Sequence, residues 1–85
     1  MPYICSKDRE RFDQAAILGL KAQSVGDLNY ILTMVCLGFL AKNKPNHYKD
    51  YNDVIGALEC CRLELYRKKV IPYENQKIKE NGDVY

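Results

Sequence analysis

The segment 28–41 restricts the fold of this chain more than any other, because it contains no charged side chain. Apolar residues occupy almost every side of the helix that it would form: Leu28, Ile31, Leu32, Met34, Val35, Cys36, Leu37, Phe39 and Leu40. A helix that is apolar all round is buried all round, and a chain of 85 residues has too little other structure to cover it. We therefore expect a homo-oligomer, most simply a two-fold dimer. The candidate interface residues are Tyr30, Met34, Leu37 and Phe39.

The same segment is too short to cross a membrane, since a spanning helix needs about 20 apolar residues. We therefore expect no contact with a membrane. The apolar fraction of 47% is that of a globular protein, so intrinsic disorder is not expected. The net charge of +2 is too small for a typical nucleic-acid-binding domain.

Four cysteines, Cys5, Cys36, Cys60 and Cys61, are expected to be free thiols. The N-terminal sequence MPYICSKDRERFD is charged where a signal peptide has its apolar core, so we expect a cytoplasmic, reducing location. Cys60 and Cys61 are adjacent, so on a helix their side chains point about 100° apart and cannot easily form a bridge. We expect Cys36 and one of the adjacent pair to pack in a core.

Helix formers, caps and breakers predict a single all-α domain over residues 1–85, a small bundle of three helices with a possible short fourth. The expected helices cover about 7–23, 25–42, 51–71 and 73–81. Ser6 is a candidate N-cap for the first helix, and Ser24 with Asp27 has the spacing of a capping box for the second. The expected buried face of the first helix consists of Phe12, Ala15, Ala16, Gly19 and Leu20.

The third helix is the best marked, with Asp50 as its cap and basic residues at its C-terminal end, which suits the helix dipole. Its inward stripe is expected at Val54, Ile55, Leu58, Cys61 and Leu65. Pro72 either ends this helix or kinks it into a continuation. Asn81 and Gly82 form the expected C-terminal stop of the last helix. Glycines at 19, 38 and 56 lie inside helices, which favours close helix crossings over a backbone left open for a ligand.

The sequence offers few parts for catalysis, so we expect no enzyme, no metal and no cofactor. His47 is the only histidine, there is no Cys-x-x-Cys motif, and no glycine-rich phosphate loop is present. The candidate acid–base carboxylates are Glu59 and Glu64. Both have basic residues three or four positions later, the spacing of ordinary surface ion pairs.

A basic and aromatic cluster near the end of the third helix is the candidate ligand site. It consists of Arg62, Tyr66, Arg67, Lys68 and Tyr73, with Lys69 beside them in the sequence. Arginine and tyrosine together suit phosphate pairing and base stacking, so a nucleotide or nucleic acid is a possible ligand. The alternative is a solvated helix end whose basic residues complement the dipole.

The strings LNYI, NDVIGALE, ELYR, PYE and NGDV occur together over nearly the whole chain. In this combination the sequence resembles a family of short proteins of tailed phages and prophages. The resemblance implies an accessory protein of a bacterial or archaeal cytoplasm, and it brings no motif chemistry to any residue. We therefore expect a non-enzymatic, oligomeric interaction protein that binds another macromolecule, with nucleotide or nucleic-acid binding as the alternative.

Overall fold

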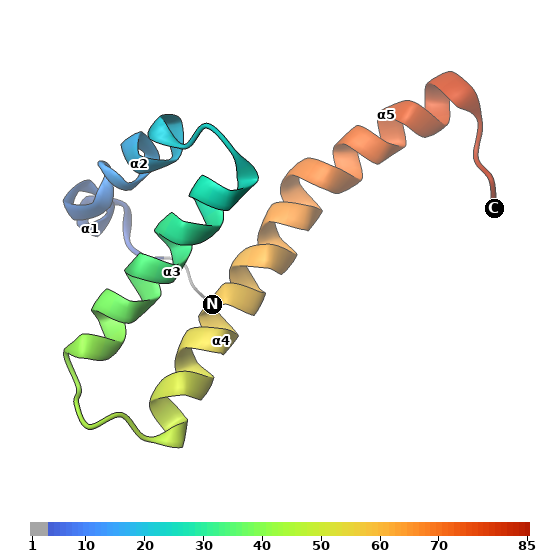
Figure 1. Cartoon of the computed structure of the whole chain (residues 1–85). Helices are drawn as coiled ribbons and strands as arrows, with labels where there is room; N and C mark the ends of the chain where they lie inside the picture. Colours follow the sequence, from blue (N-terminus) through green and yellow to red (C-terminus); the bar gives the residue numbers. More distant parts are fainter. Residues whose placement is uncertain (1–3) are drawn as a thin grey trace. The chain divides into compact units, whose positions relative to one another are not determined.

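The structure is a computed structural model that describes residues 4–85, and every regular element in them is helical (Figure 1). The all-α prediction is therefore confirmed. In chain order the elements are α1 (Ser6–Arg9), the 3₁₀ turn η1 (Glu10–Phe12), α2 (Ala15–Lys21), α3 (Val25–Ala41), α4 (Tyr48–Leu65), the π-helical turn η2 (Tyr66–Val70) and α5 (Ile71–Asn81).

Contacts within the chain divide it into two units, one ending at Val54 and the other running from Ile55 to Tyr85. The first unit contains α1, η1, α2, α3 and the first turns of α4. Within it, α2 and α3 approach each other. The second unit contains the rest of α4, then η2, α5 and the C-terminal tail.

The expected first helix, about 7–23, is interrupted in the structure. The backbone amide of Asp13 donates to the carbonyl oxygen of Glu10, and that of Ile17 donates to the carbonyl oxygen of Gln14. These bonds span three residues instead of four, so the helix tightens and turns between η1 and α2. Ser6 is not the N-cap, because α1 already begins at that residue and its cap position, Cys5, makes no side-chain capping bond.

The capping box of α3 is confirmed. The Ser24 hydroxyl accepts a hydrogen bond from the Asp27 amide at 3.1 Å. The Asp27 carboxylate reaches back and accepts from the Gln23 amide at 2.9 Å. The first bond satisfies an amide that the first turn leaves without a helical partner, and the second holds the amide of the residue before the cap. α3 then runs without interruption to Ala41, one residue short of the expected end.

α4 begins at Tyr48, earlier than predicted, because Asp50 acts from inside the first turn rather than before it. The Asp50 carboxylate accepts from the His47 amide at 2.8 Å. In the preceding loop the Asn46 side-chain amide donates to the Leu40 carbonyl at 2.8 Å and closes the end of α3. Asn46 is half-buried, so this loop residue has a defined structural role.

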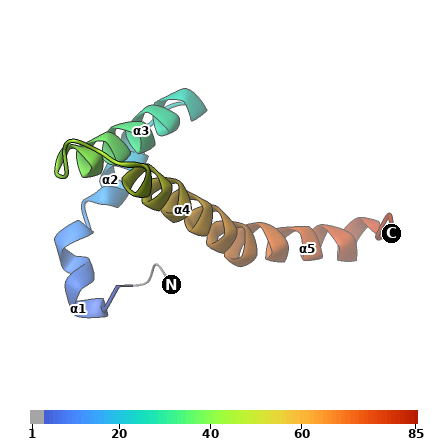
Figure 2. The same ribbon diagram turned by 90° about the horizontal axis from the view of Figure 1, so that it is seen from below.

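Pro72 does not end the helix. The chain passes from α4 through η2 into α5 as a continuous helical run, visible in Figures 1 and 2. Proline lacks an amide hydrogen, and its ring clashes with the carbonyl four residues earlier, here Lys68. A π-helical turn directly before Pro72 widens the backbone at that carbonyl, and α5 then carries proline in its first turn, where it is tolerated. The continuation left open by the sequence is the one observed.

No residue of the described part of the chain is buried, which corrects several predictions. On the predicted face of the first helix, Phe12 is 56% exposed and Leu20 83%. On the predicted stripe of α4 only Val54 is half-buried, whereas Leu65 is 59% exposed. Each of these helices is apolar on one side, as an amphipathic helix should be, but among the described residues the side chains on that side remain accessible to solvent.

The predicted core cysteines and close helix crossings are also absent from the described residues. Cys36 is half-buried, whereas Cys60 and Cys61 are both exposed. A methyl group added at Gly19, Gly38 or Gly56 would meet no atom within 4 Å beyond the adjacent residues and backbone of its own helix. Gly82 is different, since its φ of 84° closes α5 in a conformation that other residues rarely adopt, and it confirms the predicted stop.

Candidate functional site

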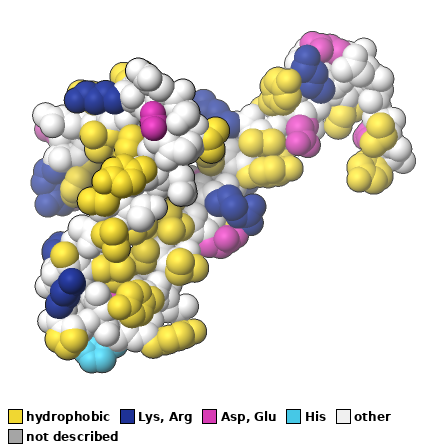
Figure 3. All heavy atoms as spheres, in the orientation of Figure 1, with side chains coloured by type: hydrophobic (Ala, Val, Ile, Leu, Met, Phe, Trp, Pro, Cys, Tyr) yellow, Lys and Arg dark blue, Asp and Glu magenta, His cyan; other side chains and the backbone are white. Residues whose placement is uncertain are grey.

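The apolar surface of α3 is the most extensive candidate site. Among the predicted interface residues, Tyr30 is 64% exposed, Met34 47%, Leu37 53% and Phe39 50%. Figure 3 shows hydrophobic side chains exposed on the visible face of the unit that contains α3. Soluble chains rarely leave so many large apolar side chains of one helix in water without a binding role.

Helical geometry sorts these side chains into two stripes on opposite sides of α3. Each residue turns the helix by about 100°, so residues that follow one another by four, three and four positions lie on the same side. The Leu28 stripe contains Leu28, Leu32, Val35 and Phe39. The Tyr30 stripe contains Tyr30, Met34, Leu37 and Ala41. The four predicted interface residues are therefore divided, with Phe39 on the side opposite to the other three.

Two polar side chains of α3 already form hydrogen bonds within the chain. Asp27 is its only charged residue, and its carboxylate is held in the N-terminal cap. The Thr33 hydroxyl donates to the Asn29 carbonyl at 2.8 Å. Between the two stripes α3 thus offers little that would recognise a charged ligand, and its chemistry is that of an apolar contact surface.

The predicted ligand cluster begins with Arg62, which is paired with a carboxylate on its own helix. Arg62 Nε donates to Glu59 Oε1 at 3.0 Å, and both side chains are exposed. The hydrogen bond, and next the attraction of the guanidinium, hold the pKa of Glu59 below its ordinary value. The same pair raises the pKa of Arg62, so its charge is permanent but largely neutralised by its neighbour.

The other members of the cluster are spread around the helix. Arg67 forms an ion pair with Glu64, and the Lys77 ammonium lies over the Tyr73 ring, 5.6 Å from its centroid. Lys68 follows Tyr66 by two positions in η2, which places the two side chains on nearly opposite sides of the turn. The helix therefore does not gather these five residues on one face.

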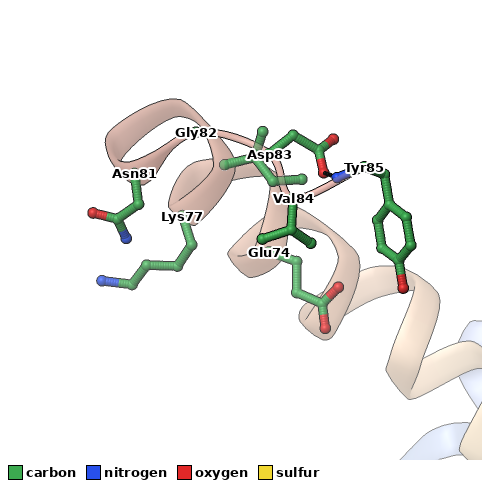
Figure 4. Close-up of a pocket in the computed structure, with 8 residues that line it drawn as sticks. Glu74, Lys77, Asn81, Gly82, Asp83, Val84 and Tyr85 are labelled. Carbon is green, nitrogen blue, oxygen red and sulfur yellow. Dashed lines mark hydrogen bonds between the residues drawn. The ribbon is translucent and has the colours of Figure 1, made fainter.

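A shallow pocket of about 390 Å³, which sequence reasoning missed, lies where the tail turns back after α5 (Figure 4). It is lined by Glu74, Lys77, Ile78, Asn81, Gly82, Asp83, Val84 and Tyr85. The Tyr85 amide donates to the Asp83 carboxylate at 2.9 Å, while the side chains of Val84 and Tyr85 remain fully in solvent. The predicted stop at Gly82 was the available signal for this turn.

The described residues contain no group of three or more His, Cys, Asp or Glu side chains that could hold a metal ion. His47 is 79% exposed and its Nδ1 lies 3.8 Å from an oxygen of Asp50, which serves the start of α4. Over the same described range, none of the helices has the length and apolar character needed to cross a membrane.

A family described as a domain of unknown function, DUF6899, matches the chain over residues 1–84. The match covers both units and every helix. No curated protein and no solved structure matches the chain. The argument about function therefore depends on the residues and the geometry given above.

Proposed function

Because the chain belongs to this family of unknown function, we propose from its own residues that it is a non-enzymatic helical interaction protein that binds another macromolecule. One observation carries the proposal: large apolar side chains cover α3, and none of the described residues is buried. Folding is driven mainly by removing apolar surface from water. A chain that leaves this surface open gains that stabilisation when a partner covers it.

The magnitude supports a macromolecular partner. Full burial of a large apolar side chain stabilises by about 1.5–3 kcal/mol, so covering one that is half exposed would contribute roughly 1 kcal/mol more. α3 carries eight large apolar side chains that are between 43% and 84% exposed. Covering them all requires a surface as long as α3 itself, roughly 25 Å at 1.5 Å per residue. A small molecule does not supply such a surface, whereas a macromolecule that contacts both stripes does.

Site-specific photo-cross-linking in cells of the source organism tests this function. A photoreactive phenylalanine at Tyr30 samples the surface of α3, and the same residue at Tyr85 is the matched control on the exposed tail. We expect a defined adduct from position 30, identified by mass spectrometry, that is missing or diffuse from position 85. Equal patterns from both positions, or no adduct from position 30, would refute an interaction surface on α3.

Nucleotide or nucleic-acid binding by Arg62, Tyr66, Arg67, Lys68 and Tyr73 is the second candidate function. The observation in its favour is η2, because π-helical turns occur frequently at functional sites and this one contains three of the five residues. Against it stand the ion pairs of both arginines and the small net charge.

Fluorescence anisotropy with a labelled single-stranded oligonucleotide tests the second candidate. Binding through phosphates weakens as salt rises. It should also be lost when Arg62 and Arg67 are both replaced by Ala, and it should survive replacement of Lys21, which belongs to α2 and not to the cluster. An affinity that changes neither with salt nor with the arginine substitutions would exclude this cluster as the site.

We also propose that the protein works in the cytoplasm. The support is chemical: the four cysteines are free, and three of them are exposed, which suits a reducing compartment. The resemblance to phage and prophage proteins leads to a further proposal, that the gene has a phage or prophage origin. Sequencing the genomic neighbourhood of the gene tests it, since phage genes should flank it.

A further inference from the structure

We propose that Cys60 and Cys61 form a binding site for a two-coordinate soft metal ion of the Cu(I) class, held by their two thiolates. The proposal goes beyond the interaction function and does not depend on the surface of α3. Both cysteines lie in the second half of α4, both are free thiols, and both side chains are exposed. A metal ion therefore reaches them directly from solvent.

The spacing of the two side chains is the first argument. Consecutive residues of an α-helix differ by about 100° in direction and about 1.5 Å in height, which places their β-carbons roughly 5 Å apart. A disulfide needs β-carbons about 3.5–4.5 Å apart, so the helix keeps the two sulfurs from bonding to each other. An ion in line between two sulfurs holds them about 4.6 Å apart, since a metal–thiolate bond is about 2.3 Å long. The helix thus spaces the two thiols for an ion between them.

The neighbouring ion pairs are the second argument, because they occupy the nearest oxygen ligands. Glu59 directly precedes the two cysteines, and its Oε1 lies 3.0 Å from Arg62 Nε, from which it accepts a hydrogen bond. Glu64 follows them by three positions and forms an ion pair with Arg67. In the part of the chain that the structure describes, no group of three or more His, Cys, Asp or Glu side chains is placed to hold a metal ion. The site therefore consists of two sulfurs alone.

This set of ligands selects the ion. Thiolates are soft donors that favour Cu(I), whereas carboxylate and carbonyl oxygens favour Mg²⁺ and Ca²⁺. Zinc also binds thiolates, but its structural sites are tetrahedral and need more protein ligands than two. Cu(I) is satisfied by two thiolates in a line. On binding, two S–H bonds are replaced by two metal–sulfur bonds, both protons pass to solvent, and no electron is transferred.

Competition for Cu(I) with the chromogenic chelator ferrozine, in anaerobic buffer that contains ascorbate, tests the site. Ascorbate keeps copper reduced and supplies no thiol that would compete. We expect each 9.9 kDa chain to take one Cu(I) from the chelator, with the same mass in light scattering before and after loading. A chain that takes up no Cu(I), or that doubles its mass because two copies share the ion, overturns the proposal.

Two double substitutions locate the site. Cys60→Ala with Cys61→Ala removes both ligands and should abolish the uptake of Cu(I), while alanine keeps a good helix former in α4 and circular dichroism stays unchanged. The matched control, Cys5→Ala with Cys36→Ala, removes the same number of thiols elsewhere in the chain and should leave the uptake unchanged. Uptake that survives the first pair of substitutions, or that both pairs reduce equally, overturns the assignment.

Single substitutions distinguish a shared ion from two separate thiols. Loss of an outer-shell group of a metal site already costs about 10–100-fold in affinity, so loss of one of two ligands should cost about 100-fold or more. Cys60→Ala and Cys61→Ala should each weaken Cu(I) binding to this extent. If either variant binds Cu(I) as tightly as the wild type, one thiol suffices and the two-coordinate site is refuted. Displacement of Cu(I) by an equal concentration of Zn²⁺ would refute it as well.

Discussion

Replacing Gly56 by Ala should stabilise the protein, although glycine inside a helix usually signals a close contact. Gly56 lies in the middle of α4, and a methyl group built there meets no atom within 4 Å. Glycine costs a helix interior about 0.5–1 kcal/mol relative to alanine, chiefly because the unfolded chain loses more freedom. With nothing to displace, the substitution should recover that amount.

The expected gain is measurable by thermal unfolding. For a chain of this size 1 kcal/mol shifts the midpoint by about 4–8 °C, so Gly56→Ala should raise it by roughly 2–8 °C. Wild type and variant are compared at one protein concentration, because self-association would make the midpoint depend on concentration.

Gly82→Ala is the matched control, since it makes the same chemical change at a φ of 84°. An L residue is strained in that conformation, so the control should destabilise the end of α5. A lower midpoint for Gly56→Ala would refute the reasoning, because it would show that another chain or segment packs closely against Gly56.

Two further predictions concern local bonds. Ser24→Ala removes the acceptor of the Asp27 amide and should cost about 1 kcal/mol of unfolding free energy in urea titrations, whereas Ser6→Ala, at a residue without a capping bond, should change it little. The Glu59 carboxylate should titrate below its ordinary pKa in carbon-detected NMR, and Arg62→Ala should bring that pKa back up toward 4.5. Since the folded pKa is the lower one, the stabilisation by this pair is present above the ordinary pKa and is lost as the pH falls through the folded pKa. An unchanged pKa in the Arg62 variant would contradict the assigned cause.

The sequence predicted local structure well wherever a few adjacent residues decide it. Ser24 and Asp27 cap α3 because their spacing alone brings hydroxyl and carboxylate to free amides. Gly82 ends α5 because it tolerates a positive φ. Pro72 left two alternatives open, a stop or a kinked continuation, and the structure shows the continuation, with a π-helical turn before α5.

The sequence failed where burial was inferred from an apolar pattern. Phe12 and Leu65 lie on the apolar sides of their helices, yet each is more than half exposed. A pattern shows which side of a helix should leave water, and it does not show whether the same chain supplies the covering layer. The spread of the candidate cluster, by contrast, could be predicted, since the ion pairs of Arg62 and Arg67 and the placement of Lys68 opposite Tyr66 all follow from spacing along a helix.

The central claim is that a partner covers α3, and amide hydrogen exchange measured in buffer and in extract of the source cells tests it most directly. Protection of the amides of residues 28–41 should be higher in the extract, because association suppresses local opening of the helix. The amides of α5 serve as the internal reference and should change less. Equal protection of residues 28–41 in buffer and in extract would contradict the claim.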